Sequence, residues 1–569
     1  MPADGWSAGM VTPAPARLVL GPLLRFVGDD EATLWVETDR ACKVEVLGCS
    51  SPTFCVAGHY YGFVRVSGLE PGACVPYDVH LDGERCWPLA DSPFPASVIR
   101  TRTPGQPLHL AFGSCRVSLP HEPPYTLSKD RDDRGREVDA LLALVERLRT
   151  QPPHEWPDAV LLLGDQIYAD QVSPETERLI EERRGRGDAS ADDPPQGEVA
   201  DFEEYTWLYR EAWSDPATRW LLSTISSAMI FDDHDVRDDW NTSRAWRERM
   251  QAQRWWHQRI RGALASYWVY QHVGNLPPEE RAADPVWQEV LETVGDTWPL
   301  LQRMAGGVDA DPTVVRWSFR WDLDRVRLVI VDSRCGRILD EGDRTMLDEA
   351  EFSWVECAVE EDAADAVDHV LVGSSLPWLL PSAIHDVQSI NEEAASKDGP
   401  RGRLAEKMRQ GADLEHWAAF RSSFDRLAAL LQRVGTGPQA PATVSVLSGD
   451  VHHTYAAKVT FDEPADSAVH QLVCSPVHHA APWFMKVAFR VAWLRPVARV
   501  VRAVARHSGV RDPSVRWKRV AGPIFGNALA TLVLDGRNAT FTVERAVPAG
   551  GSSRFGPVCS VELDGPPIG

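Results

Sequence analysis

Six short apolar runs between residues 108 and 449 constrain the fold more than any other feature of the chain. They lie at 108–113, 158–164, 227–231, 326–332, 368–373 and 443–449. Helix-like stretches fill the gaps between them, at about 136–149, 203–222, 244–271, 344–361 and 413–433. Strands that alternate with helices predict an α/β domain. Segments 181–200 and 391–403 have the composition of loops, and we expect the first to be mobile.

Residues 17 to about 103 follow a different pattern, in which apolar and polar residues alternate as in half-buried strands. The stretch "GLEPGACVPYDVHLDG" combines a Pro-Gly turn, a strand with Tyr77 and an Asp-Gly turn. It is similar to fibronectin type III-like sandwiches, in which a tyrosine holds a corner between the sheets. We therefore predict an N-terminal β-sandwich over 1–103, of the fibronectin III/Ig-like class, and a second domain over 104–569.

The formal net charge of −23 excludes general nucleic-acid binding, which needs a basic surface. An anionic substrate must then be attracted by a local cation. The first residues have neither the basic start nor the apolar core of a signal peptide, and no run approaches 18 apolar residues. These features predict a cytoplasmic protein, in which the ten cysteines are reduced thiols.

Residues 483–507 form a basic amphipathic segment, with six lysines or arginines and no acidic residue. Such a segment can lie on a membrane surface. The alternative is a surface helix, kinked at Pro496, that balances the charge of an acidic protein, and we favour this second interpretation. Residues 520–569 then return to β structure, because "LATLVLDGRNATFTVERA" predicts a hairpin with an Asp-Gly turn.

Potential metal ligands follow five of the apolar runs. The residues concerned are Ser114-Cys115-Arg116, Asp165-Gln166-Ile167-Tyr168, Asp232-Asp233-His234-Asp235, Asp332-Ser333-Arg334 and Asp450-Val451-His452-His453. In open α/β sheets the carboxyl ends of the strands line one crevice, where ligands bind. Carboxylates crowded as in "MIFDDHDVRDDW" repel one another unless a positive charge lies among them. A metal site is therefore a better interpretation than a solvated turn.

The spacing of these residues is also informative. Asp165 directly follows Gly164, where the backbone can turn and present a carboxylate that bridges two cations. Tyr168 comes three residues later, one helical turn on, and can reach the same ion. Asp450 and His452 are two residues apart, and on an extended segment they share a face.

The motifs "FGSCR", "LLGDQIYAD", "IFDDHDVRDDW" and "LSGDVHHTY", in this order, resemble those of the alkaline phosphatase D (PhoD-like) family of calcineurin-like metallophosphatases. The resemblance covers roughly residues 108 to 480. It implies a calcineurin-like metallophosphoesterase β-sandwich flanked by helices and preceded by an all-β sandwich. Asp233 stands where the wider superfamily usually has an asparagine, and Asp450 stands where it usually has a histidine.

The resemblance also implies a set of ligands. It places Cys115, Asp165, Tyr168 and His452 around one ion, and Asp165, Asp233 and Asp450 around a second. A thiolate with a phenolate suits Fe(III) better than magnesium. A site made of carboxylates suits Ca²⁺ or another hard divalent cation.

Two further residues have implied catalytic roles. His234 resembles the catalytic histidine of the superfamily, which would donate a proton to the leaving group. Arg237 has the geometry to bind a phosphate oxygen, and its alternative role is a salt bridge to Asp235 or Asp238.

The implied function is metal-dependent hydrolysis of small-molecule phosphate esters, monoesters or diesters, by metal-activated water at a multinuclear site. One alternative is a phospholipase D-like phosphodiesterase. Another is a non-catalytic metal-binding scaffold on the same fold. Such a scaffold is expected to have lost Asp165, His234, Asp450 or His452, and all four are present.

Overall fold

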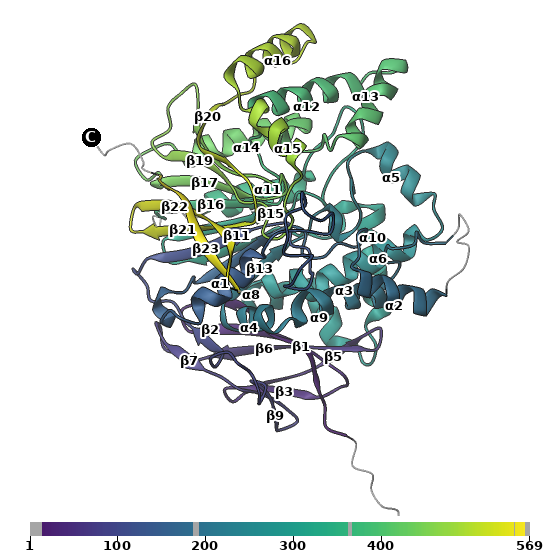
Figure 1. Cartoon of the computed structure of the whole chain (residues 1–569), viewed down its shortest axis with the longest axis vertical. Helices are drawn as coiled ribbons and strands as arrows, with labels where there is room; N and C mark the ends of the chain where they lie inside the picture. Colours follow the sequence, from purple (N-terminus) through teal and green to yellow (C-terminus); the bar gives the residue numbers. More distant parts are fainter. Residues whose placement is uncertain (1–13, 186–192, 362–366, 551, 564–569) are drawn as a thin grey trace, which may run out of the picture.

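A computed structural model of the chain describes residues 14–185, 193–361, 367–550 and 552–563. Figure 1 shows an all-β part at one end of the molecule, followed by a larger part in which sheets lie among helices. The predicted fold class, an α/β domain preceded by an all-β sandwich, is confirmed.

Two antiparallel four-stranded sheets and a short strand pair form the N-terminal sandwich. The first sheet has the order β1 (Leu18–Val27), β2 (Glu31–Thr38), β6 (His59–Ser67), β5 (Phe54–Val56). The second has the order β4 (Cys49–Pro52), β3 (Lys43–Val46), β8 (Val79–Leu81), β9 (Glu84–Trp87), and β10 (Val98–Arg100) pairs with β7 (Cys74–Pro76). Alternate residues such as Leu34 and Val36 point inward and form the core.

Tyr77 has a different role from the expected one. Its hydroxyl donates a 2.6 Å hydrogen bond to the carbonyl oxygen of Ser223, in α4 (Pro216–Thr224) of the larger part. The Ser97 and Ser223 hydroxyls also lie 2.6 Å apart. The tyrosine therefore fastens the sandwich to the helices that pack on the central sheets.

Two central sheets face each other in the larger part. One has the order β13 (Ser226–Ile230), β12 (Ala159–Leu163), β11 (Leu108–Gly113), β21 (Ala528–Asp535), β22 (Asn538–Ala549), β23 (Ser552–Glu562). The other has the order β14 (Phe319–Leu323), β15 (Val326–Val331), β16 (His369–Ser374), β17 (Thr443–Ser448), β19 (Ala468–Val473), β18 (Thr454–Thr460), β20 (Arg516–Ile524). All six predicted strands are present, and the predicted hairpin is β21–β22.

Side-chain alternation explains the four layers of this part. Leu161 and Leu163 of β12 face the core between the two sheets, whereas Val160 and Leu162 face an outer core. Helices α1 (Ala140–Leu148), α3 (Phe202–Ser214), α4 and α6 (Trp256–Ser266) fill that outer core. On the far side, α11 (Glu349–Glu360) and α14 (Arg421–Val434) cover the second sheet. Strands buried on both faces are typical of this layering.

The helix boundaries differ from the predicted ones at specific residues. The stretch 203–222 is two helices, because Asp215 ends α3 and caps α4 at Pro216, whose ring nitrogen has no hydrogen to donate. The stretch 244–271 comprises α5 (Arg244–Gln251), α6 and a π-helical turn, Tyr267–His272. The remaining helices include α8 (Pro278–Ala283), α9 (Pro285–Glu292) and α10 (Trp298–Ala310).

Of the two predicted loops, 391–403 is largely helical. It covers the end of α12 (Ser382–Ala395) and the start of α13 (Pro400–Gly411), and Gly399 at φ 101° makes the break. In the 181–200 segment, α2 (Pro174–Arg184) extends to Arg184, and residues 186–192 lie outside the described residues.

The basic segment 483–507 forms two helices rather than one kinked helix. They are α15 (Trp483–Ala492) and α16 (Arg495–His507), and Pro496 lies in the first turn of α16, where its missing N–H costs nothing. No helix in the described part of the chain combines the length and apolar character needed to span a bilayer.

Candidate active site

Parallel strands from both central sheets end at one place. Strands β11, β12 and β13 run parallel in one sheet, and β15, β16, β17 and β19 run parallel in the other. The loops after β12, β13 and β17 bring carboxylate oxygens of Asp165, Asp233 and Asp450 within 4.8 Å of one another. The cluster predicted from the strand ends therefore exists for these three residues.

The backbone at this cluster is strained. Cys115, Asp165, Asp450 and His452 have φ angles of 57°, 53°, 63° and 48°. Left-handed backbone is uncommon for residues other than glycine and concentrates at functional sites. The expectation that Asp450 and His452 share a face of an extended segment is wrong, because both are left-handed and the His452 N–H donates a 2.8 Å bond to the Asp450 carbonyl.

Two glycines allow the loops to approach so closely. A Cβ on Gly164, which has φ 109°, would lie 2.8 Å from Asp232 Oδ2. A Cβ on Gly449 would lie 2.1 Å from the hydroxyl of Ser114. That hydroxyl instead accepts a 2.9 Å hydrogen bond from the Asp450 N–H. Each Gly-Asp pair therefore lets a carboxylate approach a neighbouring strand end.

The electrostatics of the cluster favour a cation. Burial raises the pKa of Asp165 well above its usual range, although nearby His234 opposes this, and the neighbouring carboxylate of Asp232 raises it further. Burial also raises the pKa of Asp232 to about 7. Asp165 Oδ1 is buried and has no hydrogen-bond partner among the described residues. A buried, unpartnered carboxylate oxygen among other carboxylates is the environment that metal coordination satisfies.

Softer ligands lie against the carboxylates. Tyr168 donates a 3.3 Å hydrogen bond to Asp165 Oδ2, although the segment between them is a turn rather than the expected helix. The Cys115 Sγ lies 3.6 Å from the Asp450 carbonyl oxygen. Burial, followed by the charges of Asp165 and Asp450, raises the pKa of the Cys115 thiol well above its usual range. A cation nearby would favour the thiolate instead.

His452 is connected to Tyr168 through a second histidine, His479. Its ring lies 4.7 Å from that of His479, whose Nδ1 is 3.2 Å from the Tyr168 hydroxyl. Burial lowers the pKa of His452 to about 4, so its imidazole is neutral, the form that binds metals. The donors are thus carboxylates, a thiol, a phenol and an imidazole, a set that fits metal ions.

Arg334, one of the residues that follow the apolar runs, is a buried cation that pairs with carboxylates and not a metal ligand. Its guanidinium contacts Asp232, lies 3.0 Å from Asp233 Oδ1 and lies 2.6 Å from Glu415 Oε2. Asp235 does not face the cluster. Its carboxylate accepts a 2.9 Å hydrogen bond from the Asp232 N–H and closes a 3-10 turn. Three features therefore reduce the repulsion among the acidic residues after β13: the ion pairs with Arg334, the capping interaction of Asp235, and the position of Asp233, which faces the cluster.

The catalytic candidates lie on the same rim. His234 Nδ1 lies 3.0 Å from a carboxylate oxygen of Asp170, and its ring is 4.7 Å from that of Tyr168. Arg237 pairs with Glu198 at 3.1 Å, and not with Asp235 or Asp238 as the alternative interpretation expected. Its guanidinium also stacks on Trp255 at 5.4 Å.

Sequence reasoning missed several neighbours of the cluster. Asp170 stands inside the motif "LLGDQIYAD", so its position was a usable signal. His416, whose Nε2 lies 2.9 Å from Asp450 Oδ2, follows no strand and belongs to no motif, and nothing in the sequence pointed to it. The other histidines have structural contacts: His453 stacks on Tyr455, and His478 Nδ1 lies 2.7 Å from the Val117 carbonyl oxygen.

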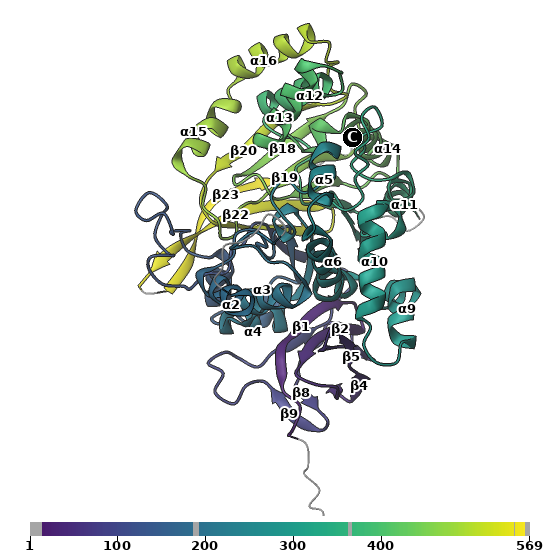
Figure 2. The ribbon, with the colours of Figure 1, turned by 90° about the vertical axis from the view of Figure 1, so that its right-hand side faces the viewer.

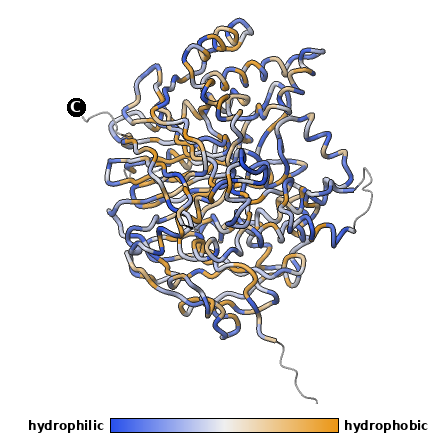
Figure 3. Tube along the Cα trace, viewed as in Figure 1, coloured by the Kyte–Doolittle hydropathy of each residue, from blue (hydrophilic) through white to orange (hydrophobic). Residues whose placement is uncertain are grey.

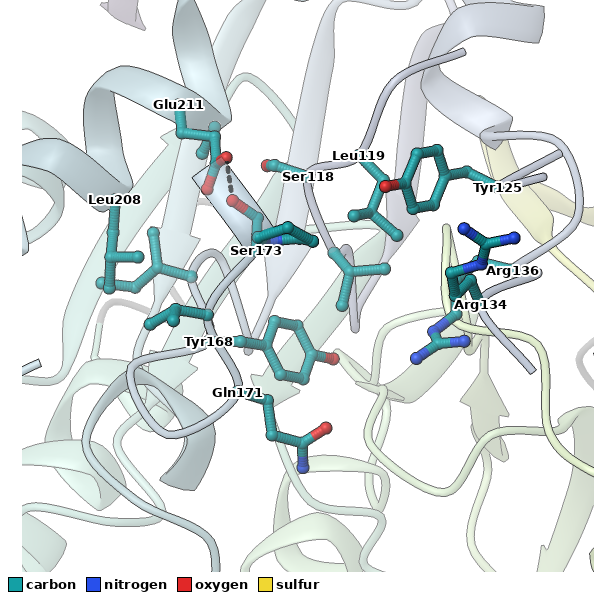
Figure 4. A pocket seen from close by; sticks show the side chains of 15 residues that line it. Ser118, Leu119, Tyr125, Arg134, Arg136, Tyr168, Gln171, Ser173, Leu208 and Glu211 are labelled. Atoms are coloured by element: carbon teal, nitrogen blue, oxygen red, sulfur yellow. Dashed lines mark hydrogen bonds between the residues drawn. The ribbon is translucent and has the colours of Figure 1, made fainter. Parts of the chain in front are cut away.

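A cavity of about 220 Å³ opens beside Tyr168. Figure 4 shows Tyr125, Arg134 and Arg136 on one side of it and Leu208 and Glu211 on the other. The remaining walls are mostly apolar, and they come from the loop after β11 and from the start of α2. A group attached to a phosphate at the cluster has space to extend into this cavity.

Comparison with protein-family models gives the same family that the sequence motifs resemble. A family model described as PhoD-like phosphatase matches residues 143–519, and one described as a domain of unknown function (DUF7800) matches residues 15–99. A solved structure of PhoD aligns over 98% of this chain and 91% of its own, with 13% identity and a TM-score of 0.56. A purple acid phosphatase, PPD1 from yellow lupin (Lupinus luteus) seeds, aligns over 97% and 75%, with 11% identity and a TM-score of 0.47. No curated protein sequence matches the chain significantly.

Proposed function

Since the chain belongs to the PhoD-like phosphatase family, we propose that it hydrolyses phosphate esters at the cluster of Asp165, Asp233 and Asp450, with metal cations as cofactors. One observation supports this proposal above all: the buried Asp165 oxygen has no hydrogen-bond partner among the described residues. It lies among carboxylates that repel one another when all are ionised, unless a cation lies between them. When bound, two cations would activate a water molecule and stabilise the charge that develops on the phosphoryl group.

We assign the holding residues from their donor atoms. Cys115, Tyr168 and His452, together with Asp165, form a set that suits Fe(III). The carboxylates of Asp165, Asp233 and Asp450 form a set that suits Ca²⁺ or another hard divalent cation. The left-handed backbone of these loops holds the donors in place before any ion arrives.

The residues on the rim act on the substrate. His234 donates a proton to the leaving oxygen, and Asp170 fixes the orientation of its ring. Arg237, held by Glu198 and Trp255, supplies a guanidinium for a phosphate oxygen. The cavity beside Tyr168 receives the organic part of the ester. Its apolar walls and the arginines of the rim favour a group with an apolar or aromatic body and a negative charge at its far end.

The direct test is metal analysis of the purified protein combined with hydrolysis of p-nitrophenyl phosphate and bis(p-nitrophenyl) phosphate. Activity is expected to follow bound metal, to disappear with a chelator and to return with added cations. The ratio of the two rates distinguishes a monoesterase from a diesterase, including a phospholipase D-like one. Metal-replete protein that hydrolyses neither ester would favour the non-catalytic scaffold.

A further inference from the structure

Helices α15 and α16 form one outer edge of the molecule, at the end opposite the N-terminal sandwich (Figures 1 and 2). Hydrophobic and hydrophilic residues are interleaved along both helices (Figure 3). In a surface helix the apolar face normally packs on the protein. In α15 and α16, however, a large part of the apolar face is exposed to solvent.

In α16 the face that packs on the protein is not the apolar one. Ala505 is buried, and Arg502 turns inward to pair with Asp386 of α12. Val500 and Val504, one turn apart and therefore on a common face, are 64% and 51% exposed. The valine stripe of this helix thus faces solvent.

The same arrangement holds in α15. Its inner side is already occupied, because Phe489 stacks on His453 with the ring centroids 4.2 Å apart, and Ala492 is buried. The outer side carries Trp483, Phe484 and Val487, which are 65%, 58% and 48% exposed. Val491 and Leu494 continue this face toward α16. Large aromatic side chains exposed in a group mark an interaction site rather than ordinary surface.

Cations accompany the exposed apolar residues on both helices. Helical periodicity places Arg490 beside Trp483 and Val487 in α15, whereas Arg495 and Arg499 of α16 lie on a neighbouring face, about 100° or more around the helix from Val500. Arg495 and Arg499, one turn apart, have no ion-pair partner among the described residues. No acidic residue occurs between 483 and 507, although the whole chain has a net charge of −23.

We propose that α15 and α16 form a docking surface for an anionic lipid bilayer. A bilayer of this kind supplies both requirements of the surface at once: hydrocarbon for the tryptophan, phenylalanine and valines, and negative headgroups for the flanking arginines. A second copy of the chain fits less well, because a symmetric contact would bring two rows of arginines together. Because Phe489 rests on His453, next to His452, docking would hold the cluster of Asp165, Asp233 and Asp450 at a fixed distance from the bilayer.

The test uses the full-length protein and sedimentation with two kinds of vesicle, phosphatidylcholine alone and phosphatidylcholine mixed with phosphatidylglycerol. One variant removes the apolar contacts (Trp483→Ser with Phe484→Ser), and another reverses the charge (Arg495→Glu with Arg499→Glu). All four side chains are exposed, so folding should not depend on them. The matched controls are Leu291→Ser with Val294→Ser, two exposed apolar residues elsewhere, and Arg210→Glu with Arg554→Glu.

We expect wild-type protein and both controls to bind the anionic vesicles. The two helix variants should bind at least about 10-fold more weakly. Each lost juxtamembrane cation costs about 5-fold and the charge variant loses two, while the other variant loses two aromatic side chains that would be buried in hydrocarbon. Hydrolysis of a soluble ester should be unchanged in every variant, which separates this proposal from the proposed function. Equal binding to both vesicles, no binding at all, or equal losses in the controls would overturn it. An oligomer that the helix variants dissociate in analytical ultracentrifugation would assign the surface to a second copy instead.

Discussion

Asp170 and His234 connect the loops after two neighbouring strands: the Nδ1 atom of His234 lies 3.0 Å and 3.1 Å from the two carboxylate oxygens of Asp170. The carboxylate also accepts a 2.7 Å hydrogen bond from the Asp238 N–H, which fixes it in place. Although burial opposes it, the charge of Asp170 and the hydrogen bond to it raise the pKa of His234 well above its usual range. The pair therefore favours the protonated imidazole on the rim, whose Nε2 lies 3.9 Å from Asp238 Oδ1.

This pair predicts a dependence on the leaving group. An activated ester needs little protonation of its leaving oxygen, whereas an alkyl ester needs much more. His234→Ala should therefore lower kcat/KM for an alkyl phosphate by about 10²–10⁴, the usual contribution of a general acid, and for a nitrophenyl ester by clearly less. Asp170→Asn should produce the same pattern in weaker form, since it acts only by positioning. Equal losses on both esters would show that His234 binds phosphate or water and transfers no proton.

Asp165→Asn should abolish hydrolysis without loss of fold. A residue outside the ligand set typically costs 10–100-fold when changed, so loss of a bridging ligand should cost more than about 100-fold. The metal-free protein should not lose thermal stability, because burial makes the Asp165 carboxylate unfavourable and an amide carries no charge. Metal content, kcat and Tm are measured together. Substantial activity at full metal content would disprove the bridging role.

Cys115→Ser should lower bound iron and bleach any visible charge-transfer absorption. The reason is that the serine hydroxyl keeps the size of the group but cannot supply the soft thiolate that lies against Asp450. Ser475, whose hydroxyl donates a 3.3 Å hydrogen bond to the Cys115 Sγ, provides the matched control as Ser475→Ala. That change should leave the iron content near wild type. Purified wild-type protein that holds only zinc would make the ferric assignment wrong.

The cavity beside Tyr168 predicts that kcat/KM depends on the size of the organic group of the ester. Leu119→Trp fills part of it, and a lost apolar contact in a pocket is worth about 10–200-fold in discrimination. The variant should therefore lose kcat/KM for naphthyl phosphate by at least about 10-fold and change little with methyl phosphate. Leu291→Trp, at a position 62% exposed, controls for the added ring. Loss of activity on both esters to the same extent would place the organic group elsewhere.

The strands and the carboxylates that directly follow them could be predicted from the sequence because both depend on local order. An apolar run followed by Gly-Asp predicts a buried strand that ends in a presented carboxylate, and β12 with Asp165 and β17 with Asp450 are built in this way. The ligation of Tyr168 was inferred from helical spacing, yet its contact with Asp165 arises in a turn.

Contacts between segments that lie far apart in the chain cannot be predicted from local sequence patterns. Arg334, which follows β15, reaches Asp232, 102 residues earlier in the chain, and Glu415, 81 residues later. The exposure of the apolar face in 483–507 also depends on what α12 and His453 already cover, and no periodicity shows this. For the same reason, the link from Tyr77 to Ser223 was mistaken for a corner within the sandwich.

The last prediction concerns the contact between the sandwich and the helices. His59 of β6 lies between Glu37 of β2, at 3.2 Å, and Glu203 of α3, at 2.8 Å. Burial alone would lower the pKa of His59, but the hydrogen bonds to Glu203 and Glu37 outweigh it and raise the pKa to about 9. A raised pKa in the folded state stabilises the protein fully below the unfolded value of about 6.5, and this contribution disappears as pH rises through 9.

His59→Gln should therefore lower the free energy of unfolding by about 2 kcal/mol at pH 6, the usual contribution of hydrogen bonds to a charged group. The difference between variant and wild type should shrink between pH 7 and 9 and vanish near pH 10, because wild-type His59 is then neutral as well. Denaturant unfolding at a series of pH values measures this difference, and His80→Gln, on β8 of the same sandwich, is the control. A destabilisation that stays constant from pH 6 to pH 10 would show that His59 contributes through packing, for example against Phe202 of α3, and not through its charge.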